Sequence, residues 1–209
     1  ENLIALEKGF ENLEKHIENV KKFGVPMIVA INRFPSDTDD EIGLIYDKFK
    51  ESGVPVAISE VWAKGGEGGL DLAKKVIELL EESKSDFHYL YELDLSLEEK
   101  IDKIACRVYG ADGVEYSSKA RKQLKQYKEM GYGSLPICMA KTQNSISDNP
   151  SLKGRPKNFK VNVREVNLSA GAGFIVPMTG PVLTMPGLPS IPSAEKIDID
   201  ADGKISGLF

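Results

Sequence analysis

The sequence predicts an α/β fold with a parallel sheet, followed by a smaller α+β region with short strands. Helical and strand-like segments alternate up to about residue 80 with short connections, the pattern of a parallel α/β sheet. The strand-like segments are almost entirely apolar, as expected for strands covered on both faces. After about residue 86 the pattern changes to helices and then to short extended pieces. We therefore predict two units, residues 1–92 and 93–209.

The first unit is expected to begin with an amphipathic helix. Apolar residues recur at alternating steps of four and three from Leu6 to Val20, which places them on one face of a helix that ends near Gly24. The apolar run at residues 25–31 is predicted to be a strand buried on both faces.

Two more helices and one strand complete this unit. We predict a helix at 40–52 and a second buried strand at 54–58. The glycine-rich segment 65–69 then leads into a third helix, whose inner face is expected to carry Leu72, Val76, Ile77 and Leu80.

The second unit contains two predicted helices. Ser96 and Glu99 have the spacing of a capping box and open the first of them. The second is predicted at 117–130. The chain then becomes rich in turns, and the short extended pieces are predicted at 136–142, 159–168, 174–177 and 182–185.

No metal site is predicted. Residues 198–205 match the opening of a calcium-binding loop, but its twelfth position would be Phe209 instead of a bidentate Glu. The Asp202-Gly203 pair between two short β-type runs favours a hairpin turn instead.

The composition excludes several classes of function. Lys and Arg number 27 against 32 Asp and Glu, and the formal net charge of −5 predicts no nucleic-acid partner. No run approaches the roughly 18 consecutive apolar residues of a membrane helix, so no membrane partner is expected. Two cysteines are too few for a disulfide scaffold, which favours a reducing compartment and a cytoplasmic location.

Aromatic residues follow both predicted strands of the first unit. Asn32, Phe34 and Pro35 come directly after one strand, and Trp62 follows the other. In open α/β sheets ligands bind beyond the carboxyl ends of the strands. Two rings there suit a planar heterocycle, and an Asn amide can read its edge. The alternative is that each ring belongs to the core.

The glycine-rich segment is a weaker candidate. Its backbone N–H groups could bind an anion at the start of the following helix. The alternative is a plain flexible connection. No Lys-Ser or Lys-Thr follows the glycines, so it is not a phosphate-binding loop of the Gly-x-x-x-x-Gly-Lys-Ser/Thr type. The complete set of candidate binding residues is Asn32, Phe34, Pro35, Trp62, Gly65, Gly66, Gly68 and Gly69.

Several motifs, in order along the chain, resemble one known family. They are VAINRFPSD (29–37), WAKGGEGG (62–69), VREV (163–166), SAGAGF (169–174), TMPGLP (184–189), IDID (197–200) and GLF (207–209). Together they resemble the C-terminal part of formate–tetrahydrofolate ligase, over essentially all 209 residues. The resemblance implies that 1–92 is the C-terminal part of a P-loop-type nucleotide- and folate-binding domain.

The resemblance also implies a reaction. The family forms 10-formyltetrahydrofolate, ADP and phosphate from formate, ATP and tetrahydrofolate, through formyl phosphate. ATP is expected with Mg²⁺, and a response to monovalent cations and a homotetramer are expected as well. The phosphate-binding loop and the formate residues belong to the family's N-terminal part. We expect that part to be missing here, so that no catalytic residue can be assigned and the fragment is inactive alone.

On this resemblance Phe34 and Trp62 stack on the pterin, or on an adenine in nearby space, and Pro35 adds an apolar edge. Asn32 and the glycines are expected to line the same pocket. Two other interpretations stay open. One is a non-catalytic module that binds folate or a nucleotide, and the other is an assembly domain.

Overall fold

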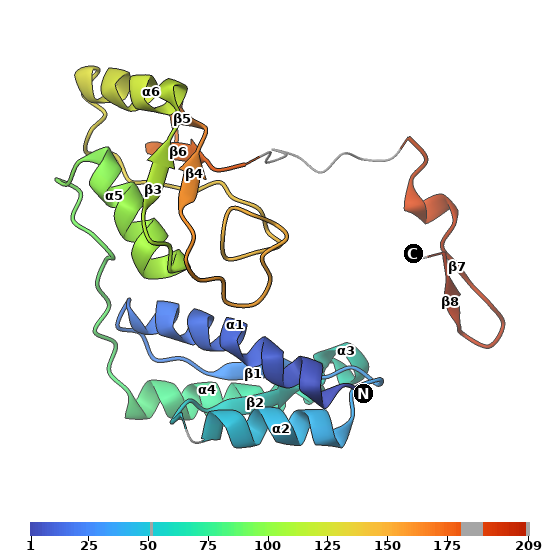
Figure 1. Ribbon diagram of the computed structural model, residues 1–209. Coiled ribbons are helices and arrows are strands. Elements are labelled where there is room, and N and C mark those ends of the chain that lie inside the picture. The colour runs from blue at the N-terminus through green and yellow to red at the C-terminus, as the bar shows by residue number, and fades with distance from the viewer. Residues whose placement is uncertain (51, 181–189, 208–209) are drawn as a thin grey trace.

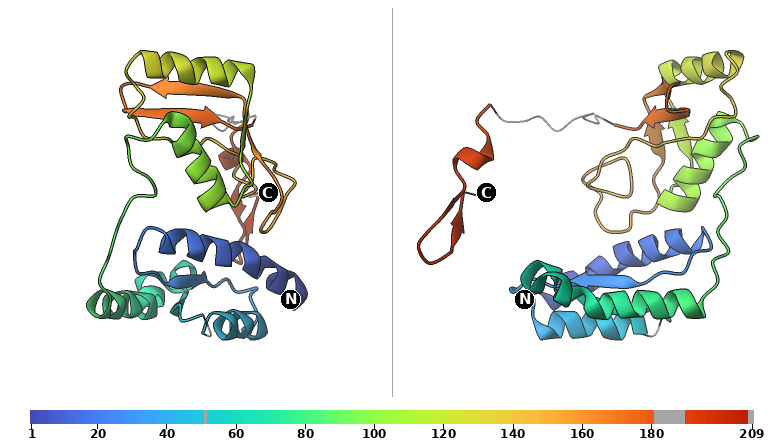
Figure 2. Two further views of the ribbon diagram at one scale, coloured as in Figure 1. Left: turned by 60° about the vertical axis from the view of Figure 1, so that its left-hand side comes forward. Right: turned by 180° about the vertical axis from the view of Figure 1, so that it is seen from behind.

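The computed structural model describes residues 1–50, 52–180 and 190–207, which form a mixed α/β structure. Two lobes and a C-terminal segment that contains a hairpin are visible in Figures 1 and 2. We define the first lobe as residues 3–82, the second lobe as 97–178, and the C-terminal arm as 190–207. In the described residues the strands form four two-stranded sheets.

The first lobe has the predicted alternation of helices and strands. β1 and β2 pair in parallel, with Val29 opposite Val56, which confirms the parallel arrangement. The elements are α1 (Leu3–Lys21), β1 (Val29–Asn32), α2 (Asp39–Lys50), β2 (Val56–Ser59), α3 (Val61–Lys64), the 3₁₀ helix η1 (Gly65–Gly69) and α4 (Leu70–Glu82).

The core of this lobe lies between α1, α2 and the sheet. Phe10 of α1 meets Phe49 of α2 edge-on, with ring centroids 5.7 Å apart. Ile17, Val54 and Val56 complete the buried cluster. The apolar stripe of α1 is therefore explained by packing on α2 and the strands.

Two expectations for this lobe are wrong. Alternate residues of β1 are exposed, Ala30 among them, so the strand is not buried on both faces. Ile77 and Leu80 of α4 are 55% and 68% exposed instead of facing inward. The physical reason is that the sheet has only two strands in the described residues, which is too narrow to cover a whole helix face.

The second lobe contains both predicted helices. Its elements are α5 (Leu97–Lys103), the π-helix η2 (Ile104–Tyr109), β3 (Val114–Tyr116), α6 (Ser118–Glu129), β4 (Val161–Val163), β5 (Glu165–Ser169) and β6 (Phe174–Met178). The capping box of Ser96 and Glu99 is present with both of its hydrogen bonds, as predicted. Ser117 caps α6, and Gly131, at φ +87°, follows its end.

The predicted extended pieces are only partly strands. The 136–142 segment makes two isolated bridges, Ile137 with Ile175 and Ala140 with Met178, and is not a regular strand. The 159–168 piece divides into β4, parallel to β3, and β5, antiparallel to β6. The strand predicted at 182–185 lies outside the described residues.

A buried lysine connects α5 to the segment that follows α6 in the second lobe. Lys100 of α5 is fully buried, and its Nζ donates to the carbonyl oxygens of Gly133 (2.9 Å) and Leu135 (3.2 Å). Burial lowers its pKa. Leu97, Ile101, Leu124, Val166 and Ile175 form the apolar core around it.

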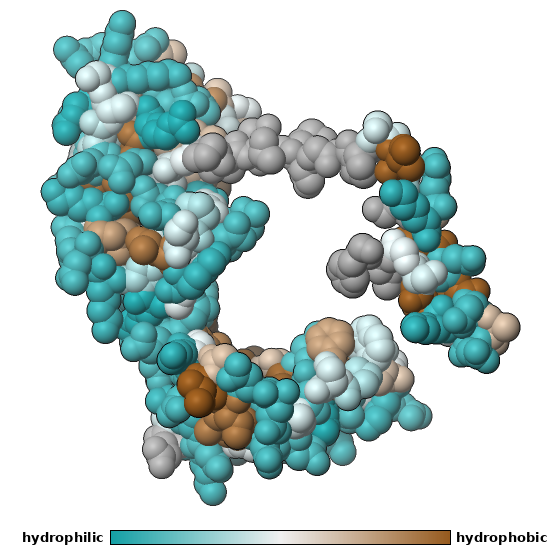
Figure 3. All heavy atoms as spheres, turned by 45° about the vertical axis from the view of Figure 1, so that its right-hand side comes forward, coloured by the Kyte–Doolittle hydropathy of each residue, from teal (hydrophilic) through white to brown (hydrophobic). Residues whose placement is uncertain are grey.

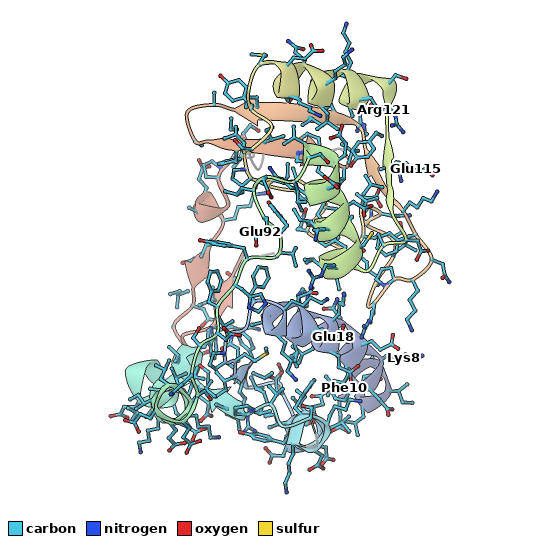
Figure 4. The ribbon with its side chains drawn as sticks, turned by 90° about the vertical axis from the view of Figure 1, so that its left-hand side faces the viewer. Lys8, Phe10, Glu18, Glu92, Glu115 and Arg121 are labelled. Atoms are coloured by element: carbon cyan, nitrogen blue, oxygen red, sulfur yellow. The ribbon has the colours of Figure 1, made fainter. Side chains whose placement is uncertain are left out.

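Hydrogen bonds and an ion pair connect the two lobes. Arg155 of the second lobe pairs with Glu18 of α1 (Nη2 to Oε2, 2.8 Å), and the Asn12 amide donates to the Gly154 carbonyl (2.9 Å). Figure 4 marks Phe10 and Glu18 on α1, with Phe10 nearer to α2. α1 therefore packs its apolar side on α2 and makes polar contacts to the second lobe with its other side.

The C-terminal arm ends in a small hairpin. β7 (Asp198–Ile199) and β8 (Ile205–Ser206) are antiparallel, and Gly203 adopts φ +80° in the turn, as the Asp-Gly pair predicted. Figure 3 shows apolar side chains on the surface of the arm, where Ile191, Ile197, Ile199 and Ile205 are exposed. Among the described residues no helix has the length and apolar character needed to cross a membrane.

Candidate functional site

The two aromatic rings that follow the strands lie side by side. The ring centroids of Phe34 and Trp62 are 5.7 Å apart, with an interplanar angle of 53°. Phe34 is 41% exposed and Trp62 is 64% exposed, so neither ring belongs to the core. We call this pair the aromatic platform. It lies beyond the carboxyl ends of β1 and β2, where open α/β sheets bind ligands.

A tight turn holds Phe34 at this place. The Phe34 N–H donates to Oδ2 of Asp37 (2.8 Å), and the Asp37 N–H donates back to the Phe34 carbonyl (3.0 Å). Pro35 occupies the position of this turn where its fixed φ is favourable. The residue before Phe34 is anchored as well, because the Arg33 N–H donates to the Ser59 carbonyl (2.9 Å).

Trp62 lies in the one-turn helix α3, shortly after β2. The Lys64 N–H donates to the Glu60 carbonyl (2.9 Å), and the Lys64 ammonium pairs with the Glu60 carboxylate (2.6 Å). These two contacts close the turn that presents Trp62 to solvent.

The glycine-rich segment forms the 3₁₀ helix η1. The Gly68 carbonyl accepts the Glu60 N–H (2.9 Å). A Cβ atom on Gly68 would lie 2.4 Å from the Glu60 backbone, whereas Gly66 has open space. Gly68 is therefore required for close packing against the start of α3.

The other candidate residues lie around the platform. Asn32 is the last residue of β1, and its side chain is exposed, as is Pro35. Gly65 adopts φ +60° at the start of η1, and Gly69 packs against Val61. Asp37 was not among the predicted site residues, although its position two residues after a proline is typical of a turn.

By its fold and this surface, the chain is a mixed α/β protein with an aromatic platform at the carboxyl end of a parallel sheet. A comparison with protein-family models identifies the family. The model of formate–tetrahydrofolate ligase matches residues 1–209, the whole of the sequence. The chain therefore belongs to the formate–tetrahydrofolate ligase family, as the motifs had indicated. Enzymes of this family are ligases of one-carbon metabolism that use formate, tetrahydrofolate and ATP as substrates.

Proposed function

We propose that this chain is part of an ATP-dependent ligase that forms 10-formyltetrahydrofolate. In this reaction the γ-phosphoryl group of ATP passes to a formate oxygen, and ADP leaves. The N10 amine of tetrahydrofolate attacks the resulting formyl phosphate, and phosphate leaves. The family match supports this reaction class. The exposed, paired rings of Phe34 and Trp62 carry the proposal that this chain contributes the pterin-binding surface.

On this proposal the aromatic platform stacks on the pterin, or on an adenine in nearby space. Pro35 adds an apolar edge, and the Asn32 amide hydrogen-bonds the heterocycle. The glycines Gly65, Gly66, Gly68 and Gly69 line the same pocket. Stacking contributes about 0.5–1.5 kcal/mol per aromatic pair beyond area burial. Stacking contributes mainly by positioning the substrate. An N10 amine held beside the formyl phosphate attacks it faster than an amine that diffuses freely.

Phosphoryl transfer is assigned to another part of the enzyme. The sequence has no Gly-x-x-x-x-Gly-Lys-Ser/Thr motif. In the part of the chain that the structure describes, no three His, Cys, Asp or Glu residues lie close enough to hold a metal ion. We propose that the phosphate loop, the formate residues, Mg²⁺ and any monovalent-cation site lie outside this sequence, and that the 209 residues alone are inactive.

The proposal includes the architecture implied by the family. Residues 1–92 form the C-terminal part of a P-loop-type nucleotide- and folate-binding domain, and 93–209 form an α+β region. The whole enzyme is a homotetramer in the cytoplasm.

Trp62 is the only tryptophan, so its fluorescence reports directly on the platform. We expect tetrahydrofolate to quench this fluorescence saturably after correction for absorbance. Phe34→Ala removes one face of the platform and should weaken the apparent affinity about twofold to tenfold. In the intact enzyme, Trp62→Ala should raise the Michaelis constant for tetrahydrofolate more than it lowers turnover.

Phe87→Ala is the matched control, because Phe87 is also an exposed ring but stacks on Phe23 and meets Tyr89 edge-on, away from the platform. It should leave the quench unchanged. No saturable quench, or an equal loss in both variants, would contradict a pterin surface in this chain. A binding module without catalysis would quench normally, but the intact enzyme would form no formylated product.

A further inference from the structure

A cavity lies away from the aromatic platform. It has a volume of about 450 Å³ and is formed by one side of α1, by the end of η2 and by the 141–154 segment. We call it the interlobe cleft, because its walls come from both lobes. Its volume lies within the range of about 300–1,000 Å³ that is usual for small-molecule sites.

The walls of the interlobe cleft carry no negative charge. None of the thirteen described residues that line it is Asp or Glu, although the chain has 32 of these residues. Asn12, Asn19, Gln143 and Asn144 contribute carboxamides, and Lys141 and His16 contribute basic groups. An anion would therefore meet hydrogen-bond donors there and no like charge.

Cations also gather around the cleft. Lys15 and Lys22 both donate to the carbonyl oxygen of Arg107, the residue before the lining residue Val108. Arg155 follows the lining residue Gly154 and pairs with Glu18. Burial, and then the neighbouring Lys22, lower the pKa of Lys15 to about 8. Lys15 is thus both buried and close to other positive charges beside the cleft.

One wall can hold a flat ring. Tyr109 and Phe23 line the cleft, and both are partly exposed. The Lys141 ammonium lies 5.5 Å from the centre of the Tyr109 ring and donates to the carbonyls of Thr142 (2.8 Å) and Ser145. An aromatic face beside a fixed cation suits a ligand that combines a planar ring with a negative group.

We propose that the interlobe cleft binds a small phosphate ester that carries a flat heterocycle, of about the size of a nucleoside monophosphate. The phosphate meets Lys141, His16 and the carboxamides, and the heterocycle packs against Tyr109 and Phe23. The site is independent of the aromatic platform and of the proposed ligase function. It also joins the two lobes, because its ligand contacts α1 and the 141–154 segment together.

The test is isothermal titration calorimetry of the full 209-residue chain with AMP. Asn19→Asp is nearly isosteric and places a negative charge on the wall, so we expect it to weaken AMP binding at least about tenfold. Lys8→Gln is the matched control, because it lowers the net charge equally on the same helix but does not line the cleft. It should change the affinity less than about twofold.

Further ligands and variants separate this site from others. Adenosine should bind at least about tenfold more weakly than AMP, since it lacks the phosphate. Trp62→Ala should leave unchanged the AMP binding that Asn19→Asp weakens, and any AMP binding that depends only on Trp62 belongs to the aromatic platform. If Asn19→Asp does not fold, Gln143→Glu introduces the same charge on the opposite wall. No saturable AMP binding, equal binding of adenosine, or loss of binding in Trp62→Ala would each overturn the proposal.

Discussion

Single residues next to the aromatic platform determine where its rings can lie. Asp37 fixes the turn that carries Phe34, and Gly68 fixes the backbone from which Trp62 extends. The positions of the two rings could be predicted, because both residues directly follow strands that pair in parallel. The contacts of Asp37 and Gly68 could not, because they depend on backbone geometry that residue type alone does not reveal.

A substitution at Gly68 tests this dependence. Gly68→Ala would place a Cβ atom 2.4 Å from the Glu60 backbone, so the backbone must shift. We expect the free energy of unfolding to fall by about 1–3 kcal/mol, measured in urea through Trp62 fluorescence. Gly66→Ala, where nothing lies within 4 Å, should change it by less than about 0.5 kcal/mol. Equal effects of the two substitutions would disprove the close packing of η1 on α3.

At the scale of helices and strands, the local signals and the parallel pairing of β1 with β2 were predicted correctly, whereas the burial of individual faces was not. The capping box of α5 and the boundaries of α6 were predicted because caps depend on residues a few positions apart. Burial of β1 and of Ile77 on α4 was predicted wrongly, since a strand's burial depends on how many strands lie beside it. The interlobe cleft was missed because its walls are far apart in the sequence.

The capping box gives a prediction with a defined pH dependence. Ser96→Ala removes the hydroxyl that accepts the Glu99 N–H, and we expect it to cost about 0.5–2 kcal/mol of stability. The Ser96 hydroxyl and its backbone N–H hold the pKa of Glu99 below its ordinary value. A lowered pKa stabilises the fold above the ordinary carboxyl pKa, and this contribution is lost as the pH falls through the lowered value.

Thermal unfolding from pH 7 to pH 3 is the measurement. The stability difference between Ser96→Ala and the parent chain should shrink as the pH falls. Ser85→Ala, at an exposed position, should follow the parent throughout. A difference that stays constant over this pH range would contradict the coupling between Ser96 and Glu99.

At the scale of the whole molecule, the two lobes have separate apolar cores. Phe49 belongs to a cluster built from α1, α2 and β2, and Leu124 belongs to one built from α5, α6, β4, β5 and β6. Hydrogen bonds and the ion pair of Glu18 with Arg155 connect the two lobes. Since partly exposed ion pairs contribute little, each lobe is expected to be stable largely through its own core.

Hydrogen exchange followed by mass spectrometry tests this independence. Phe49→Ala empties a core position that is 1% exposed and should cost the first lobe about 3–5 kcal/mol. Peptides from α2 should lose protection, and peptides from α6 should keep it. Leu124→Ala should have the opposite effect. Loss of protection in both lobes from either substitution would show a single cooperative unit.

The open sheet of the first lobe also affects how the protein behaves in concentrated solution. β1 has a strand on one side only among the described residues, and its other side presents backbone groups that can pair with another chain. The exposed Leu70, Ile77 and Leu80 of α4 belong to the same lobe and add apolar surface to it. Such an edge is a template for edge-to-edge aggregation. Aggregation of the isolated chain is therefore expected to begin at this sheet.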